Sequence, residues 1–378
     1  MHRTPAGART ARRDAERGPL VLAAVTLLTL ALVLAGCSGG DGKAAAVKRT
    51  TTTAPETTTT KPPPPKAPLT GLDDPSGQSI TRPAASLKVE NTEFARPQAG
   101  LDQADVVYEE VVEGGITRFV AIFNSQVPDV IGPVRSVRAM DPDIVWPLGG
   151  IFAFSGGTQD NVDHAATAPV NIVTENNTGV LVRNAQGQPP REAPHNLYAL
   201  GGPLFGVGGQ PTPPPPLFQY LAAGAPPTQA QGVVSMHLGF SPGYDPTYAW
   251  DGASGTWKRS MNGAPHNTVD GKQLAPKNVV VQFTDYPGVS DGQTVGEGDV
   301  WVFTDGTVRM GRWVRPNHDQ PARYVDAAGA PILLRPGTTW VELLPVGAAV
   351  DMELAPPPTT TAPTTAPPTT TTQAKKKK

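Results

Sequence analysis

The stretch Ala95–Arg138 concentrates side chains that can bind an anion. Its charged members of interest are Glu109, Glu110, Glu113, Arg118, Arg135 and Arg138. The planar guanidinium group of arginine matches carboxylate or phosphate oxygens in bidentate geometry. The turn at Gly132-Pro133 can also present backbone N–H groups to an anion. One interpretation is therefore an anion-binding cleft near Gly132-Pro133, lined by the three arginines and by the side of Glu109 and Glu113.

The same charges have a purely structural interpretation, in which the arginines neutralise the glutamates and hold the loops. Alternation along Val106–Val112 places Glu110 on one face of a strand and Glu109 with Glu113 on the other. Each carboxylate then needs a basic partner or solvent. A protein that serves only as a scaffold would have no concave site that contains these residues.

Two histidines occur in a repeated Pro-His-Asn, at His195-Asn196 and at His266-Asn267. A histidine can act as a general base or a metal ligand, but a single histidine in a loop is more often a hydrogen-bonded turn residue. If the protein were an enzyme that acts on a cell-wall or surface glycan, its acid and base would come from Glu113, Asp141 and His195.

No metal or cofactor is predicted. The chain has no His-x-x-x-His and a single cysteine, so a zinc site is not expected. Ser155-Gly156-Gly157 lacks the G-x-S-x-G context of a hydrolase, and we expect no hydrolase signature. Asp291–Asp299 contains three carboxylates, but their spacing departs from a calcium loop and predicts a turn. Five of the six tryptophans lie in the C-terminal half, where they either fill a core or stack on sugar rings.

The N-terminus is typical of a lipoprotein leader. Several arginines precede an apolar run from Leu20 to Leu34, which ends in Leu34-Ala35-Gly36-Cys37. This pattern predicts a signal peptide at 1–36 and lipidation of Cys37, the only cysteine of the chain. An uncleaved membrane anchor is the alternative, but the apolar run is near the short limit for spanning a bilayer. The mature protein is thus expected on the extracytoplasmic face of the cell membrane, anchored by acyl chains such as palmitate.

Two segments have the composition of linkers. Residues 37–68 are rich in Thr, Pro and Lys and predict a tether between the lipid and the folded body. Residues 355–378 repeat this composition and end in four lysines, which predicts a disordered tail. The lysines either keep the tail in solution or contact an anionic surface.

The folded body between these segments is acidic. Leu69–Glu353 contains 17 lysines and arginines against 29 aspartates and glutamates, so its formal charge is −12. A body of this charge is a poor candidate for contacts with phosphate backbones, and nucleic acid is disfavoured as a partner.

The body is predicted to contain two domains. The first, 69–206, mixes strands such as Val106–Val112 and Ile116–Phe123 with short helical pieces and is expected to be α+β or α/β. Residues 207–230 are a Pro- and Gly-rich connection. The second domain, 231–354, is expected to be mostly antiparallel β. Its clearest element is a hairpin turning at Asp305-Gly306.

Several segments, taken in order, resemble the YerB-like bacterial lipoproteins, whose body is a two-part domain of unknown function. The segments are ARPQAGLDQADVVYEEVVEGGITRFVAIF with GPVRSVR, APHNLYAL, WKRSMNGAPHNTVDGKQLAPKNVVVQF, GDVWVFTDG and LRPGTTWVELLP. The similarity covers Leu69–Pro345. It implies a surface lipoprotein with separate N- and C-terminal parts and no established activity.

The sequence favours a binding protein over an enzyme. The expected partners are the membrane, through Cys37, and a cell-envelope polymer or envelope protein. The expected ligand-binding residues are Glu109, Glu113, Arg118, Arg135, Arg138, Asp141, His195, Asn196 and His266.

Overall fold

The structure is a computed structural model that describes residues 62–226 and 230–356. These residues belong to one compact unit, Lys61–Lys378. The predicted leader, Cys37, most of the tether and the tail from residue 357 lie outside the described residues. Within the described ranges, no helix has both the length and the apolar character needed to cross a bilayer. The folded body begins slightly before the predicted residue 69, since Ala67 is buried and Lys66 pairs with Asp73 at 2.7 Å.

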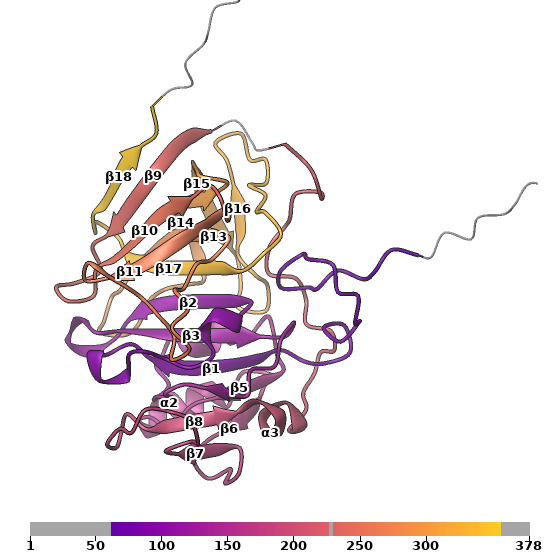
Figure 1. Ribbon diagram of the computed structural model, residues 1–378, viewed down its shortest axis with the longest axis vertical. Helices are drawn as coiled ribbons and strands as arrows, with labels where there is room; N and C mark the ends of the chain where they lie inside the picture. The colour runs from indigo at the N-terminus through magenta and orange to yellow at the C-terminus, as the bar shows by residue number, and fades with distance from the viewer. Residues whose placement is uncertain (1–61, 227–229, 357–378) are drawn as a thin grey trace, which may run out of the picture. The chain divides into compact units, whose positions relative to one another are not determined.

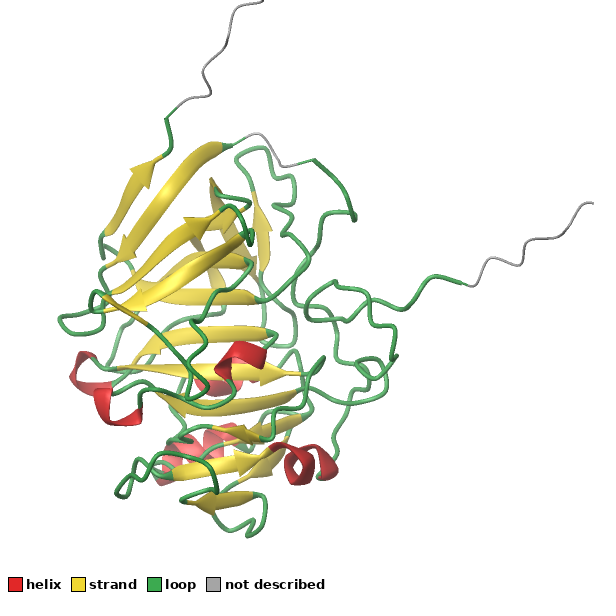
Figure 2. Cartoon of the chain, viewed as in Figure 1, coloured by secondary structure: helices red, strands yellow, loops and turns green. Residues whose placement is uncertain are grey.

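One large mixed sheet dominates the described body (Figures 1 and 2). Its strand order is β12-β11-β10-β9-β15-β14-β13-β17-β2-β3-β1-β5-β6, with β16 beside β15 and β18 beside β9. A small sheet, β4-β8-β7, accompanies it. The strands of the first half are β1 (Ala85–Glu90), β2 (Val106–Val111), β3 (Thr117–Phe123), β4 (Val130–Ile131), β5 (Ile151–Ala153), β6 (Asn171–Val173), β7 (Leu181–Arg183) and β8 (Leu197–Leu200).

The second half contributes the remaining strands. They are β9 (Gln231–Leu238), β10 (Pro246–Asp251), β11 (Thr256–Met261), β12 (Ala264–Pro265), β13 (Asn278–Thr284), β14 (Gly296–Thr304), β15 (Thr307–Arg315), β16 (Arg323–Val325), β17 (Thr339–Pro345) and β18 (Val350–Leu354). Most neighbours here are antiparallel, as expected, but β17 runs parallel to β13 and to β2. The sheet therefore runs without a break through both predicted domains.

Helices are few and short among the described residues. The α-helices are α1 (Asp141–Val145), α2 (Gln159–Ala165) and α3 (Gly201–Gly206), and the 3-10 turns are η1 (Glu93–Ala95), η2 (Leu101–Gln103) and η3 (Glu113–Gly115). The expected α+β or α/β character of the N-terminal half is therefore not well supported, and the described body is mostly β. The short apolar segments pair as strands because parallel β1, β5 and β6 give their backbone groups partners.

Local turn chemistry fixes the hairpin between β14 and β15. Asp305 and Gly306 both have positive φ, at 51° and 69°, as a two-residue turn of this twist requires. The predicted turn at Asp291–Asp299 is wrong for its last four residues, because Gly296–Asp299 pair with Arg312–Arg315 as the start of β14. The connection after residue 206 contains no strand over the described residues 207–226, and its Leu217 and Phe218 are buried in the core.

The sheet curls so that its β9–β12 end packs over its middle strands. Trp257 of β11 contacts Phe303 of β14 edge to face, with ring centroids 5.7 Å apart. In Figure 1, β10 and β11 lie across β13 and β17. One apolar core fills the space inside the curl, and a second lies on the other face of the sheet, under α1 and the 207–226 segment.

A buried arginine joins the two halves inside the curl. Arg259 of β11 donates to Glu109 of β2 at 2.6 Å, and its other terminal nitrogen lies 3.5 Å from Glu342 of β17. It also donates to the hydroxyl of Tyr248 at 2.6 Å and lies over the ring of Trp340 at 4.7 Å. All three charged side chains are fully buried, so each depends on the others for compensation.

Replacement of Arg259 by methionine is expected to lower the free energy of unfolding by about 3–5 kcal/mol, because it leaves two carboxylates buried without a cation. Arg312→Met is the matched control, since the side chain of Arg312 is half-exposed and its ion pairs are at the surface. We expect it to cost about 1 kcal/mol or less. Urea unfolding of both variants measures the difference. Equal costs for the two replacements would contradict the stabilising role of Arg259.

Candidate functional site

The candidate site lies where β1 and β2 end. Arg118 of β3 is in register with Glu90, the last residue of β1, and with Glu110 of β2. Arg118 therefore lies at the carboxyl ends of β1 and β2, near the start of the antiparallel β3 between them.

The loop after Gly132-Pro133 brings the other two arginines to Arg118. The loop is fixed along β1, because Glu90 N donates to Pro133 O and Arg135 N donates to Lys88 O, both at 2.9 Å. The carbonyl of Ser136 then accepts from Arg118 at 2.9 Å and from Arg138 at 3.3 Å. We call Arg118, Arg135 and Arg138 the arginine patch.

Two carboxylates belong to the arginine patch. Glu113 contacts Arg138 at 2.7 Å, and the buried Glu90 lies 3.4 Å from Nε of Arg135. Glu90 also contacts Nδ1 of His195 at 2.9 Å. Arg118 contacts no carboxylate within ion-pair distance among the described residues. Three guanidinium groups therefore face two carboxylates, which leaves one positive charge in excess.

The surroundings of Arg118 disfavour its charge. Burial, together with the positive charges of Arg138 and Arg135, lowers the pKa of Arg118 to about 10. The residue is only 7% exposed, whereas the side chains of Arg135 and Arg138 are 18% and 13% exposed. The patch is thus mostly covered, with access through Arg135 and Arg138. Nε of Arg135 is buried and has no hydrogen-bond acceptor among the described residues.

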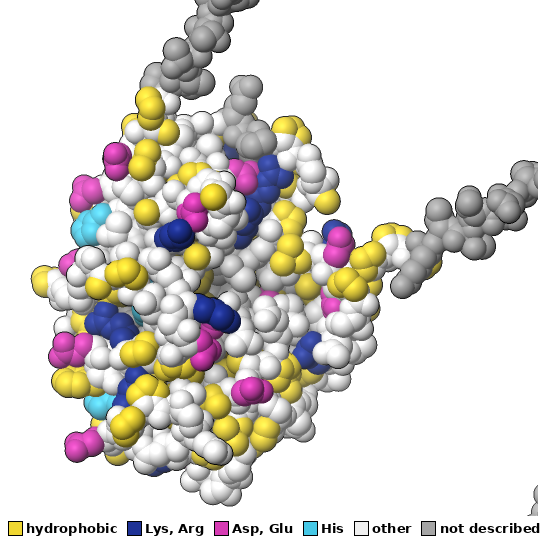
Figure 3. Space-filling view, viewed as in Figure 1, with side chains coloured by type: hydrophobic (Ala, Val, Ile, Leu, Met, Phe, Trp, Pro, Cys, Tyr) yellow, Lys and Arg dark blue, Asp and Glu magenta, His cyan; other side chains and the backbone are white. Residues whose placement is uncertain are grey.

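The arginine patch is not part of a larger basic surface of the described residues on the face drawn in Figure 3. On the face drawn in Figure 3, basic and acidic side chains of the described residues are interspersed, without a broad area of a single sign. Attraction of an anion therefore has to come from a specific group of side chains. The pocket described below, in the C-terminal half, is lined by residues other than the three arginines.

Behind the patch lies a buried group of three charges. Lys88 contacts Asp141 at 2.7 Å and also contacts Glu110, and all three side chains are fully buried. Burial, together with the neighbouring carboxylate of Asp141, raises the pKa of Glu110 from 4.5 to about 8. Asp141 is therefore a structural neighbour of the patch, engaged by Lys88 and by the backbone N–H of Arg138 at 2.7 Å.

The structure separates some of the predicted site residues from the patch. Glu109 and His266 both contact Arg259 in the buried network. Nδ1 of His266 accepts from Arg259 at 3.1 Å, and Nε2 lies 2.9 Å from Gln98. Burial, with the charges of Arg259 and Arg96, lowers the pKa of His266 well below 6.5, so the ring is neutral. Asn196 accepts from Arg183 at 2.8 Å, away from the patch.

The predicted pairing of Glu109 with Glu113 on one face is wrong. β2 ends at Val111, and Glu113 belongs to η3, where strand alternation no longer applies. Glu113 consequently reaches Arg138 and Ser290, while Glu109 points to Arg259.

Sequence reasoning missed two features of the site region. Glu90 joins Arg135 to His195, and its only signal was its place at the end of an apolar strand. The chain also contains Gly239-Phe240-Ser241-Pro242-Gly243, which fits the G-x-S-x-G spacing. Ser241 lies in a turn after β9 and donates to the carbonyl of Gly115, and no helix follows it. It therefore lacks the strand–turn–helix context of a hydrolase nucleophile.

Within the described ranges, no group of three or more His, Cys, Asp or Glu side chains is arranged to hold a metal ion. The remaining chemistry of the site is that of charged hydrogen bonds. An oxyanion can accept from several guanidinium nitrogens at once, and such bonds are roughly twice as strong as neutral ones.

Comparison with known proteins defines the family. Residues 69–204 match the N-terminal domain, and residues 236–341 the C-terminal domain, of the family described as "Protein of unknown function (DUF3048)". The chain belongs to this family.

One relative is the "Putative lipoprotein YerB" of Bacillus subtilis (strain 168), which is 30% identical over 296 residues, or 74% of this chain and 86% of the relative. A crystal structure of the YerB protein from Bacillus subtilis has a similar fold. It superposes with a TM-score of 0.64 at 24% identity and covers 76% of this chain and 99% of that chain. These comparisons confirm the YerB-like resemblance.

Glu110 makes the stability of the body depend on pH. Because its pKa is about 8 in the folded state and ordinarily 4.5, the folded state binds more protons than the unfolded state between these values. The contribution of the protonated carboxyl to the free energy of unfolding is fully present below pH 4.5 and is lost as pH rises to about 8. Glu110→Gln has no carboxyl to ionise, so it does not lose this stability as pH rises. We expect the variant to gain roughly 3 kcal/mol relative to the unaltered protein between about pH 5 and about pH 8.

Urea unfolding at the two pH values measures this gain. Glu113→Gln is the control, because the side chain of Glu113 is 55% exposed and its pKa is lowered: partial burial raises the pKa, but the hydrogen bonds to Glu113 and the charge of Arg138 together lower it by more. A pH-independent difference between Glu110→Gln and the unaltered protein would exclude a protonated Glu110.

Proposed function

We propose that this protein is an extracytoplasmic, membrane-anchored lipoprotein that binds an anionic ligand of the cell envelope at the arginine patch. The observation that carries the proposal is the convergence of Arg118, Arg135 and Arg138 around two carboxylates. The excess positive charge lies beside the partly exposed Arg135 and Arg138. An oxyanion that accepts from the partly exposed guanidinium groups of Arg135 and Arg138 would neutralise it.

A neighbouring aromatic side chain suggests that the ligand also has an apolar part. Phe94 is 63% exposed, and its ring centroid lies 5.3 Å from that of His195. His195 in turn contacts Glu90, the partner of Arg135. A ligand that carries an anionic group next to an apolar group would therefore contact both the arginine patch and Phe94.

The proposed location rests on the leader sequence and on the family. The segment 1–36 and Cys37 have the pattern of a lipoprotein signal, and the relative from Bacillus subtilis is named as a lipoprotein. The Thr- and Pro-rich residues that follow Cys37 are long enough to separate the body from the head groups. The net charge of −12 over Leu69–Glu353 argues against nucleic acid as the anionic ligand.

The alternative, an enzyme that acts on an envelope glycan, receives less support from the geometry. Its candidate acid and base residues are each engaged: Glu113 pairs with Arg138, Asp141 with Lys88, and His195 with Glu90. None of them is an unpaired carboxylate facing a second catalytic group. A binding site can use the same charged side chains while their ion pairs stay intact, whereas an acid–base catalyst would need one of these side chains free of its partner.

Replacement of Arg135 by alanine is expected to weaken binding of anionic envelope polymers, because it removes the most accessible guanidinium of the patch. Loss of one charge-assisted contact costs about 1.5–3 kcal/mol, or roughly ten- to a hundredfold in Kd. The mature chain, Cys37–Lys378, is titrated with fractionated polymers and membrane extracts at low and high salt. The unaltered chain should bind saturably, with an affinity that falls as salt increases.

Arg183→Ala is the matched control, because Arg183 forms a partly exposed ion pair with Glu175 at 2.6 Å outside the patch. It should leave binding unchanged. If Arg135→Ala lowers stability but leaves binding intact, the arginines form an internal ion-pair network and the proposed function is wrong. Absence of saturable binding by the unaltered chain would also refute it.

The anchoring part of the proposal has its own test. Cys37→Ser removes the only thiol of the chain, so the variant should incorporate no labelled palmitate and should move from the membrane fraction to the medium or soluble fraction. Retention of the variant in the membrane after an alkaline carbonate wash would indicate an uncleaved helical anchor instead.

A further inference from the structure

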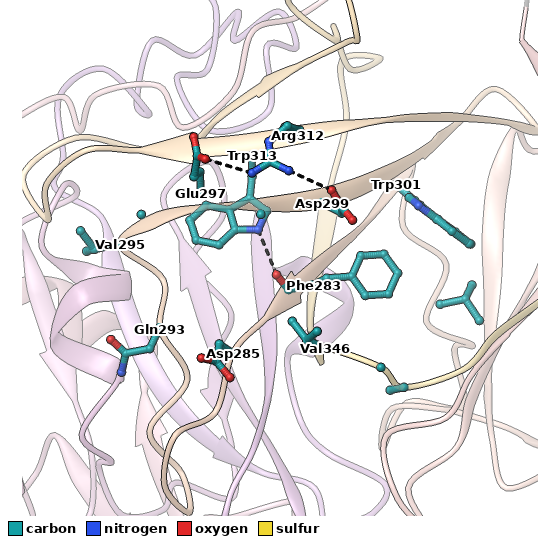
Figure 4. A pocket seen from close by; sticks show the side chains of 15 residues that line it. Phe283, Asp285, Gln293, Val295, Glu297, Asp299, Trp301, Arg312, Trp313 and Val346 are labelled. Carbon is teal, nitrogen blue, oxygen red and sulfur yellow. Dashed lines mark hydrogen bonds and ion pairs between the residues drawn. The ribbon is translucent and has the colours of Figure 1, made fainter.

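A pocket lies in the C-terminal half, and the arginine patch contributes no residue to its lining. It has a volume of about 560 Å³ and is bounded by β14, β15, the end of β13 and the 346–350 loop before β18 (Figure 4). This volume is in the range of small-molecule sites. The residues that matter below are Phe283, Glu297, Asp299, Trp301 and Arg312. We call this space the β14–β15 pocket.

Alternating residues of β14 form one wall of the pocket, which is both polar and aromatic. Glu297, Asp299 and Trp301 are at i, i+2 and i+4 of β14 and therefore project from one face. Asp299 is in register with Arg312 of β15, and Trp301 is in register with Met310. The charged rim and the indole ring consequently lie side by side along two paired strands.

Arg312 holds the two carboxylates in place. It donates to Glu297 Oε1 and to Asp299 Oδ1, each at 3.1 Å (Figure 4). The second oxygen of each carboxylate accepts no hydrogen bond from the described residues. The side chains of Glu297 and Asp299 are 65% and 70% exposed, so these oxygens are accessible to a ligand.

Aromatic and aliphatic side chains form the rest of the lining. Trp301 is half-buried and meets Phe283 edge to face, with ring centroids 5.4 Å apart. Val346, which also lines the pocket, is 67% exposed. The pocket thus combines an apolar surface with a rim that contains both hydrogen-bond donors and hydrogen-bond acceptors.

The charges of the rim exclude an anionic ligand. The lining contains three carboxylates, those of Asp285, Glu297 and Asp299, and one guanidinium, that of Arg312, so the pocket is negatively charged. A simple cation would satisfy the carboxylates but would leave the apolar wall formed by Trp301 and Phe283 without a partner. Hydroxyl groups donate and accept, and they can satisfy both kinds of partner. A pyranose ring carries such hydroxyls at its edge and has C–H groups on its faces, which suit an aromatic wall.

We propose that the β14–β15 pocket binds a short, uncharged hexose or N-acetylhexosamine chain. Trp301 and Phe283 contact the C–H face of a sugar ring, while the free oxygens of Glu297 and Asp299 accept from its hydroxyls and Arg312 donates to them. The site is independent of the arginine patch. Either site can be present without the other.

The mature chain, Cys37–Lys378, is titrated with the tetramer of N-acetylglucosamine, with cellotetraose and with tetralysine, with tryptophan fluorescence and calorimetry as readouts. We expect saturable binding of at least one of the two sugars and none of tetralysine. Trp301→Ala should weaken sugar binding at least tenfold. Asp299→Asn should weaken it several-fold, and because Asp299 is mostly exposed this variant keeps the fold.

Met310→Ala is the matched control. Met310 is the cross-strand neighbour of Trp301 and is 53% exposed, but it is absent from the lining of the pocket. It should bind sugar as the unaltered chain does. Binding of tetralysine alone would identify a cation or basic-peptide site and overturn the proposal. Absence of saturable sugar binding, or sugar binding that survives both Trp301→Ala and Asp299→Asn, would also overturn it.

Discussion

The ion pairs of Arg259 inside the curled sheet are the interaction on which the rest of the described body depends. Arg259 comes from β11, Glu109 from β2 and Glu342 from β17, so three distant segments meet at one guanidinium. Burial raises the pKa of Glu342 well above 4.5, with Glu109 contributing, which reflects the cost of placing two carboxylates together. The cation and the hydroxyl of Tyr248 offset this cost. The curl brings the end of the sheet that contains β11 over β2 and β17.

Closure of the sheet in this way also determines where charge can be used for binding. Inside the curl, Glu109 and His266 are fully engaged with Arg259. On the opposite face of the same strands, Arg118 projects between Glu90 and Glu110, and the loop after Pro133 adds Arg135 and Arg138. One strand pair therefore supplies a stabilising network on one face and an arginine patch on the other. The proposed glycan pocket lies farther along the sheet, where β14 and β15 extend past their neighbours.

Much of the fold could be predicted from local sequence signals. The Asp305-Gly306 turn and the alternating residues around it fixed the β14–β15 hairpin, and the β2–β3 pair was recognisable from its apolar runs and double glycine. The parallel pairing of β17 with β2 could not be predicted, because it joins residues more than two hundred positions apart with no local pattern. The α+β or α/β class expected for the N-terminal half overstated its helical part, because the α-helices among its described residues are only five to seven residues long.

The candidate site was predictable in composition but not in pairing. The three arginines were identified from their spacing, whereas Glu90 could be recognised only once β1 was placed beside Arg118 and the loop of Arg135. Glu109 was predicted to line the anion-binding cleft, whereas it pairs with Arg259, because strand alternation alone does not say which face is buried under β11. The pocket residues Glu297 and Asp299 were assigned to a turn because their spacing departs from a calcium loop, and their pairing with β15 has no local signal. Gly298 is in fact required by packing, since a Cβ there would lie 2.5 Å from the indole nitrogen of Trp313.

The most direct test of the proposed anion site is an NMR titration of the arginine side-chain Nε–Hε signals of the mature chain with inorganic phosphate. The excess charge of the patch predicts that the signals of Arg118 and Arg135 shift together and saturate with one dissociation constant, while the signal of the buried Arg259 stays in place. Small, unsaturable shifts spread over the exposed arginines, with Arg118 and Arg135 unaffected, would contradict an anion site at this place in the fold.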